Sequence, residues 1–170
     1  WKLGGTRLFM SNYPMEQSRI MFHRQIRQRA ETLAPFLHFD QDPYVVLANG
    51  KLYWIIDAYT TSTYYPYSEH FTRHTVDDKR KIKQTTTTTD PTKFLSGANY
   101  IRNSVKVVVD AYQGEINFYV FESADPIIQV WQKIFPELLK PMDKMPAELR
   151  SHIRYPEGFL LAQGLVYAKY

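Results

Sequence analysis

The stretch that decides the fold is Asn99-Tyr-Ile-Arg-Asn-Ser-Val-Lys-Val-Val-Val-Asp-Ala-Tyr-Gln-Gly-Glu-Ile-Asn-Phe-Tyr-Val-Phe-Glu122. Two β-rich runs flank Gln113-Gly114, where a glycine can adopt the positive φ of a tight turn. If these two residues form the loop, one face of the hairpin is wholly apolar and packs in a core, whereas the other is mixed and looks toward solvent or a partner. The apolar pairs are then Ala111 with Ile116, Val109 with Phe118 and Val107 with Val120, and the mixed pairs are Tyr112 with Glu115, Asp110 with Asn117, Val108 with Tyr119 and Lys106 with Phe121.

A second hairpin is predicted around Asn49-Gly50, because both residues tolerate the positive φ of a type I′ turn and apolar runs flank them. Alternation places one set of side chains on an apolar face and another set on a mixed face. The apolar set is Val45, Leu47, Leu52, Trp54 and Ile56, and the mixed set is Tyr44, Val46, Tyr53, Ile55 and Asp57.

The two hairpins share a short echo, because Trp54-Ile-Ile-Asp-Ala-Tyr59 and Val107-Val-Val-Asp-Ala-Tyr112 both run three apolar residues into Asp-Ala-Tyr. Asp57 and Asp110 both fall on the mixed faces. We interpret the echo as two hairpins of one antiparallel sheet, although six positions can also match by chance.

Helical periodicity appears on both sides of the hairpins. A stripe of apolar residues from Met15 predicts an amphipathic helix to about Ala34, with an Arg27–Glu31 pair on it. Asp125-Pro126 is an N-cap followed by proline at the first helical position. Shorter helices are expected from Lys144 to about His152 and after Tyr155-Pro156. The sequence therefore predicts an α+β fold, an antiparallel sheet from two β-hairpins covered by amphipathic helices, in a single domain over 1–170 with a flexible loop at 76–92.

Composition limits the function classes. The chain has 170 residues and no cysteine, which excludes disulfides and thiolate sites. A net charge of +4 is a mild excess, and acidic residues interrupt the basic clusters, so no nucleic-acid partner is expected. No run approaches the roughly 20 apolar residues of a membrane span. Because the chain opens at Trp1 without an initiator Met, and Tyr170 follows no helix stop signal, we expect a segment of a longer protein.

Several longer strings together resemble a family of large bacterial multi-span membrane proteins catalogued as uncharacterised protein family 0182. The resemblance implies a location more than an activity: a soluble portion outside the cytoplasm, attached to the cell membrane. It implies no catalytic residues and no cofactor. The strings are Leu33-Ala-Pro-Phe-Leu37, Asp42-Pro-Tyr44, Tyr53-Trp-Ile-Ile-Asp-Ala-Tyr-Thr-Thr61, Tyr65-Pro-Tyr-Ser68, Asn99-Tyr-Ile-Arg-Asn-Ser-Val-Lys106 and Met145-Pro-Ala-Glu-Leu-Arg150.

Two groups of residues are candidate binding sites. Asp57 and Asp110 form a carboxylate pair if the hairpins are adjacent, and a separation of roughly 5–9 Å suits acid/base or nucleophilic work on a glycosidic bond. The competing interpretation is that strand-end aspartates bond nearby backbone. The second group offers flat rings and hydroxyls to a sugar or a protein, or else covers the sheet. Its tyrosines are Tyr59, Tyr64, Tyr65 and Tyr67.

A metal site is not expected. His70 and His74 share a face only in a helix, and the neighbouring residues do not favour one. The leading hypothesis is a non-enzymatic extracytoplasmic module that packs against other segments of its own full-length chain or binds other envelope proteins. The alternatives are a glycan-binding or glycan-hydrolysing domain and a surface for anionic lipid headgroups. No oligomeric state is predicted.

Overall fold

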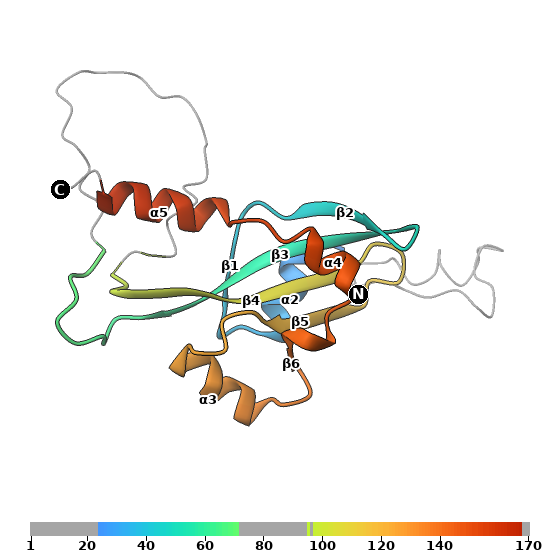
Figure 1. The fold of residues 1–170 in the computed structure, drawn as a ribbon. Coiled ribbons are helices and arrows are strands. Elements are labelled where there is room, and N and C mark those ends of the chain that lie inside the picture. The colour runs from blue at the N-terminus through green and yellow to red at the C-terminus, as the bar shows by residue number, and fades with distance from the viewer. Residues whose placement is uncertain (1–23, 72–94, 96, 168–170) are drawn as a thin grey trace, which may run out of the picture.

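The computed structural model describes residues 24–71, 95 and 97–167, which form one sheet with helices on both faces (Figure 1). The strand order is β1-β3-β4-β5-β6, and β2 pairs with β3 further along that strand. All neighbouring strands are antiparallel except β5 and β6. The strands are β1 (His38–Phe39), β2 (Tyr44–Ala48), β3 (Lys51–Ser62), β4 (Tyr100–Asp110), β5 (Ile116–Val120) and β6 (Leu139–Pro141), and the helices are α2 (Ile26–Leu33), α3 (Pro126–Ile134), the 3-10 turn η2 (Met142–Lys144), α4 (Ala147–Ser151) and α5 (Glu157–Tyr167).

The predicted α+β class is confirmed, and so is the interpretation of the sequence echo. β3 and β4 are direct antiparallel neighbours, paired from Tyr53 opposite Asp110 to Ser62 opposite Tyr100. β3 is longer than the strand predicted at Lys51–Ala58, because Tyr59 to Ser62 continue it. The hairpins recognised separately in the sequence are therefore joined through their long inner strands.

The Asn49-Gly50 hairpin forms as predicted. Ala48 pairs with Lys51, so the loop has two residues, and Asn49 and Gly50 have φ angles of 49° and 69°. Both angles are positive, as a type I′ turn requires. Local chemistry accounts for the conformation of this turn, and the carboxylate of Glu148 in α4 also accepts a hydrogen bond from the backbone N–H of Asn49 at 2.6 Å.

The predicted register of the second hairpin is wrong by two residues. Val109 rather than Ala111 lies opposite Ile116, and the loop is wider than Gln113-Gly114 alone. The carboxylate of Asp110 accepts hydrogen bonds from the backbone N–H groups of Tyr112 and Gln113, at 2.7 and 2.8 Å, which opens the turn. A shift of two preserves the side-chain faces, so the predicted apolar face still enters the core.

Both faces of the sheet are packed, which corrects the expectation that the mixed face looks outward. One core holds Val107 and Phe118 under Ala30 of α2 and Ile128 of α3. The opposite face carries a second core, where Leu149 of α4 lies over the strands (Figure 1). The strand side chains of that second core are Val46, Ala48, Ile55, Val108 and Tyr119.

The apolar face of the first hairpin is only partly covered. Ile56 is fully buried and Trp54 is partly buried against the first core, but the residues nearer the turn are exposed. Leu47 pairs with Leu52 across the strands, and both side chains remain exposed, as does Val45. The predicted alternation is right, but no helix in the described part of the chain covers the apolar face of this hairpin near its tip; α4 contacts the tip from the opposite face, where Glu148 accepts a hydrogen bond from the backbone N–H of Asn49.

The sequence predicts where α2 ends better than it predicts which of its apolar residues are buried. α2 ends at Leu33, just before Pro35, and the Nε atom of Arg27 lies 2.8 Å from Glu31. Leu33 is nevertheless exposed. The predicted start of that helix at Met15 and the predicted loop at 76–92 lie outside the described residues, which begin at residue 24. Within the described residues, no helix has the length and apolarity to cross a bilayer.

Candidate functional site

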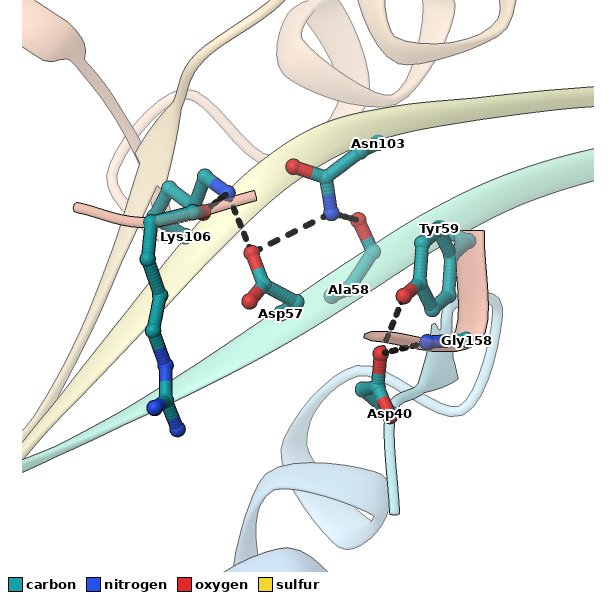
Figure 2. Close-up of polar contacts among 8 residues, drawn as sticks. Asp40, Asp57, Ala58, Tyr59, Asn103, Lys106 and Gly158 are labelled. Carbon is teal, nitrogen blue, oxygen red and sulfur yellow. Dashed lines mark hydrogen bonds and ion pairs between the residues drawn. The ribbon is translucent and has the colours of Figure 1, made fainter. Parts of the chain in front are cut away.

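A buried ion pair occupies the centre of the sheet. Asp57 of β3 and Lys106 of β4 are direct cross-strand partners, and their side chains are only 4% and 1% exposed. The amide of Asn103 donates to the same carboxylate oxygen at 3.3 Å. The ammonium of Lys106 also lies 4.8 Å from the centre of the Phe121 ring. Figure 2 shows Lys106 and Asn103 converging on Asp57.

The protonation of Asp57 is governed by its burial. Removal from water raises the pKa of this carboxyl, and the attraction and hydrogen bond of Lys106 oppose the rise without cancelling it. An ion pair in this setting is costly to break, because loss of either partner leaves a charge that water cannot reach. The pair therefore acts as a fixed connection between β3 and β4.

A second buried carboxylate, Asp40, joins the sheet to α5. It accepts hydrogen bonds from the hydroxyl of Tyr59 and from the backbone N–H of Gly158, the latter at 3.2 Å (Figure 2). Its other oxygen accepts from the backbone N–H groups of Gln41 and Asp42. Burial, together with the neighbouring Asp40, raises the pKa of the Tyr59 hydroxyl. Asp40 thus satisfies an orphan donor at the N-terminus of α5 from a distant part of the chain.

Asp125 performs the same task for α3. Its carboxylate accepts from the backbone N–H of Ile127 at 3.0 Å and from the hydroxyls of Thr60, Ser104 and Tyr100. Burial alone would raise the pKa of Asp125, but these hydrogen bonds outweigh it and hold the pKa below the usual range. Burial is the main cause that raises the pKa of Tyr100 to about 12, and its hydrogen bond to Asp125 is the second cause. The N-cap predicted from sequence is therefore part of a larger buried network.

The two predicted aspartates lie on one face but are not brought together. Asp57 is opposite Lys106 and Asp110 is opposite Tyr53, so four residues of strand, or roughly 13 Å, separate them along the sheet. Asp110 binds the backbone of its own loop, and Asp57 is occupied by Lys106. This separation is larger than the roughly 5–9 Å that the alternative of an acid/base pair requires.

The predicted tyrosines divide into buried and exposed members. Tyr59 is fully buried, whereas Tyr64, Tyr65 and Tyr67 are exposed beyond the end of β3. The ring of Tyr65 stacks on Tyr100 with centroids 5.3 Å apart. The four rings therefore do not form one platform, because Tyr59 belongs to the contact with Asp40.

Sequence reasoning missed Lys106, Asp40 and Tyr44 as partners in this region. The signal for Lys106 was present: a single lysine within an apolar strand run needs an internal counter-charge. The Tyr44 hydroxyl is buried with no hydrogen-bond partner in the described part of the chain, and the guanidinium of Arg154 lies 3.8 Å from its ring centre. Burial, reinforced by the charge of Asp57, raises the pKa of Tyr44 to about 12.

The buried carboxylates Asp40, Asp57 and Asp125 serve as connections between elements of the fold. Each of the three buried carboxylates already accepts hydrogen bonds from groups that hold elements together. Over residues 24–71, 95 and 97–167, no group of three or more His, Cys, Asp or Glu is placed to bind a metal ion. His70 is described, but the predicted partner position 74 lies outside these residues.

Comparison with known proteins gives one consistent result. The model of the uncharacterised protein family UPF0182 matches residues 1–170. The chain is similar to UPF0182 proteins of Cupriavidus necator (46% identity), Sulfurovum sp. (45%) and Pelotomaculum thermopropionicum (43%), each aligned over 100% of this chain. It spans only 16–17% of the length of these relatives. No solved structure matches it.

Proposed function

This chain belongs to the uncharacterised protein family UPF0182, and from that premise we propose that it is a non-enzymatic packing module on the extracytoplasmic side of a multi-span membrane protein. Its work is to hold a rigid sheet against other segments of the same long polypeptide. Other envelope proteins are further candidate partners.

The observation that carries the proposal is the use made of the buried carboxylates. Asp57 is paired with Lys106, and Asp40 and Asp125 each fix the start of a helix to the sheet. A general base needs a free acceptor that can reach a substrate, whereas each of these carboxylates is buried and already accepts hydrogen bonds from internal donors. Connections of this kind make a rigid body whose outer surfaces can dock without rearrangement.

The extracytoplasmic placement is supported by the resemblance described above, in which the family looks like multi-span proteins with a long region outside the cytoplasm. The relatives are also much longer than this chain, which covers about a sixth of each. Such length leaves room for membrane segments and for docking partners in one polypeptide.

The second candidate, a glycan-binding or glycan-hydrolysing domain, is weaker. It needs Asp57, Asp110 and at least two of the tyrosines around one cleft. Asp57 is enclosed by Lys106, and Tyr59 is buried against Asp40, so these two side chains cannot contact a sugar without unfolding part of the sheet. A surface for anionic lipid headgroups has no specific observation in its favour.

The placement is tested by labelling the full-length protein in intact cells with a membrane-impermeant maleimide. Gln113→Cys introduces a thiol on an exposed loop of a segment that has no cysteine of its own. We expect labelling of intact cells at the level reached after lysis. Labelling that appears only after lysis would place the module in the cytoplasm and reject the proposal. Val107→Cys, at a buried position, is the matched control that stays unlabelled while the fold persists.

A further inference from the structure

Helix α5 buries two small residues against the sheet and leaves several large apolar residues exposed. Gly158 and Ala162 are buried toward the sheet, whereas Leu160 is 59% exposed and Tyr167 is 84% exposed. A surface helix normally has the reverse arrangement, with large apolar side chains in the core. α5 lies along one face of the sheet (Figure 1), and its exposed apolar side chains are available for contact with another segment.

The outward side has a notch at its centre. Leu160, Gly164 and Tyr167 follow spacings of four and three and therefore share one stripe of the helix. A Cβ atom at Gly164 would meet nothing within 4 Å. Glycine in a helix interior costs about 1 kcal/mol relative to alanine. In the described structure, nothing contacts this position to offset that cost.

The polar side chains of α5 are few. Glu157, in the first turn, is the only charged residue of α5. The side-chain oxygen of Gln163 accepts a hydrogen bond from the hydroxyl of Tyr155 at 2.7 Å. The outer face of α5, defined here as Leu160, Leu161, Gly164 and Tyr167, is therefore almost free of groups that need water.

We propose that the outer face of α5 receives a second, apolar helix from elsewhere in the same polypeptide, and that the two helices cross at Gly164. This inference rests on the proposed function and names the surface that does the docking. A glycine between larger residues lets two helix backbones approach closely. A lipid surface would gain nothing from that notch, whereas a helix would fill it.

The size of the face decides between a segment of the same chain and a separate protein. Eleven helical residues extend about 16 Å. One face of such a helix is far smaller than the roughly 800 Å² that each partner contributes to a stable complex. A segment of the same polypeptide needs less area, because tethering supplies a high effective concentration. The relatives, of which this chain covers about a sixth, are long enough to contain it.

The test is photo-crosslinking in the full-length protein in its native membrane. A benzophenone amino acid replaces Leu160 on the outer face of α5, and in a matched control it replaces Lys133, which is exposed on α3. We expect the Leu160 probe alone to form an intrachain product, whose peptide maps to an apolar helical segment outside these 170 residues. A lipid adduct, a second polypeptide, a peptide from within these 170 residues, or no product above the Lys133 control would overturn the inference.

Variants at Gly164 add an independent measurement. Gly164→Phe fills the notch and should lower the yield of the intrachain product severalfold, whereas an unchanged yield would reject the crossing at Gly164. The maleimide test at Gln113 is separate from both measurements. If Gln113→Cys is labelled only after lysis while the intrachain product persists, the extracytoplasmic placement fails and the docking of α5 stands. If Gln113→Cys is labelled in intact cells and no product forms, the docking fails alone.

Discussion

Lys106 and Asp57 face each other across the two central strands, and both side chains are at least 96% buried. The pair lies on the side of the sheet opposite the main core and connects β3 to β4 where no water can screen the charges. Its strength depends on both members being present, because either charge alone would be stranded in the interior.

Removal of one member should therefore cost more than removal of both. We expect Lys106→Met and Asp57→Leu each to lower the free energy of unfolding by about 3–5 kcal/mol, and the double variant to recover most of that loss. Urea denaturation of the four proteins measures the coupling. Additive losses would show that the two side chains do not act as a pair.

The two glycines of α5 make a matched comparison. A Cβ at Gly158 would lie 3.1 Å from the Asp40 carboxylate and 3.4 Å from the Tyr59 hydroxyl, and Asp40 is held by several hydrogen bonds and cannot withdraw. Gly158→Ala should therefore destabilise the chain. Gly164→Ala meets no neighbour and should stabilise it by about 1 kcal/mol through helix propensity. Thermal melts of both variants measure these opposite signs, and a stabilising Gly158→Ala would contradict the close packing at Asp40.

The lowered pKa of Asp125 predicts that the stability of the chain depends on pH. Its pKa is lowered in the folded protein, so its contribution to stability is present above the usual value of 3.8 and is lost as the pH falls through the lowered pKa. Asp125→Asn should be destabilised at neutral pH by about 1–3 kcal/mol. The difference from the parent should shrink as the pH falls below 3.8. Denaturation curves across this range measure it, with the exposed Glu137→Gln as a control; a constant difference would contradict the prediction.

Local chemistry in the sequence was sufficient for several elements. Asn49-Gly50 forms the predicted turn and Asp125-Pro126 begins α3 where predicted, because the positive φ angles of a type I′ turn and the N-cap hydrogen bond to Ile127 involve neighbouring residues. Alternation also identified the residues of the main core on β4 and β5 correctly. These are features in which the chain interacts with itself over a few residues.

The parts that failed depend on contacts between distant residues. The wider second loop is accompanied by a hydrogen bond from the guanidinium of Arg29 to the carbonyl of Gly114, a contact across 85 positions. Tyr59 is buried and does not join the predicted group of tyrosines, because its hydroxyl donates a hydrogen bond to Asp40 of a different segment. The partner of Asp57 is set by the register of β3 against β4, which neither hairpin specifies by itself. A single sequence carries little signal for such pairings.

The most direct measurement of the central claim is the reactivity of one introduced thiol in two settings. Leu160→Cys is modified by maleimide in the 170-residue chain and in the full-length protein, with Gln113→Cys as the matched exposed control. If α5 docks on another part of the polypeptide, the rate at Leu160→Cys falls about tenfold or more in the full-length protein, because access limits thiol reactivity, and the rate at Gln113→Cys does not change. Equal rates at Leu160→Cys in both proteins would contradict the account of this chain as a packing module.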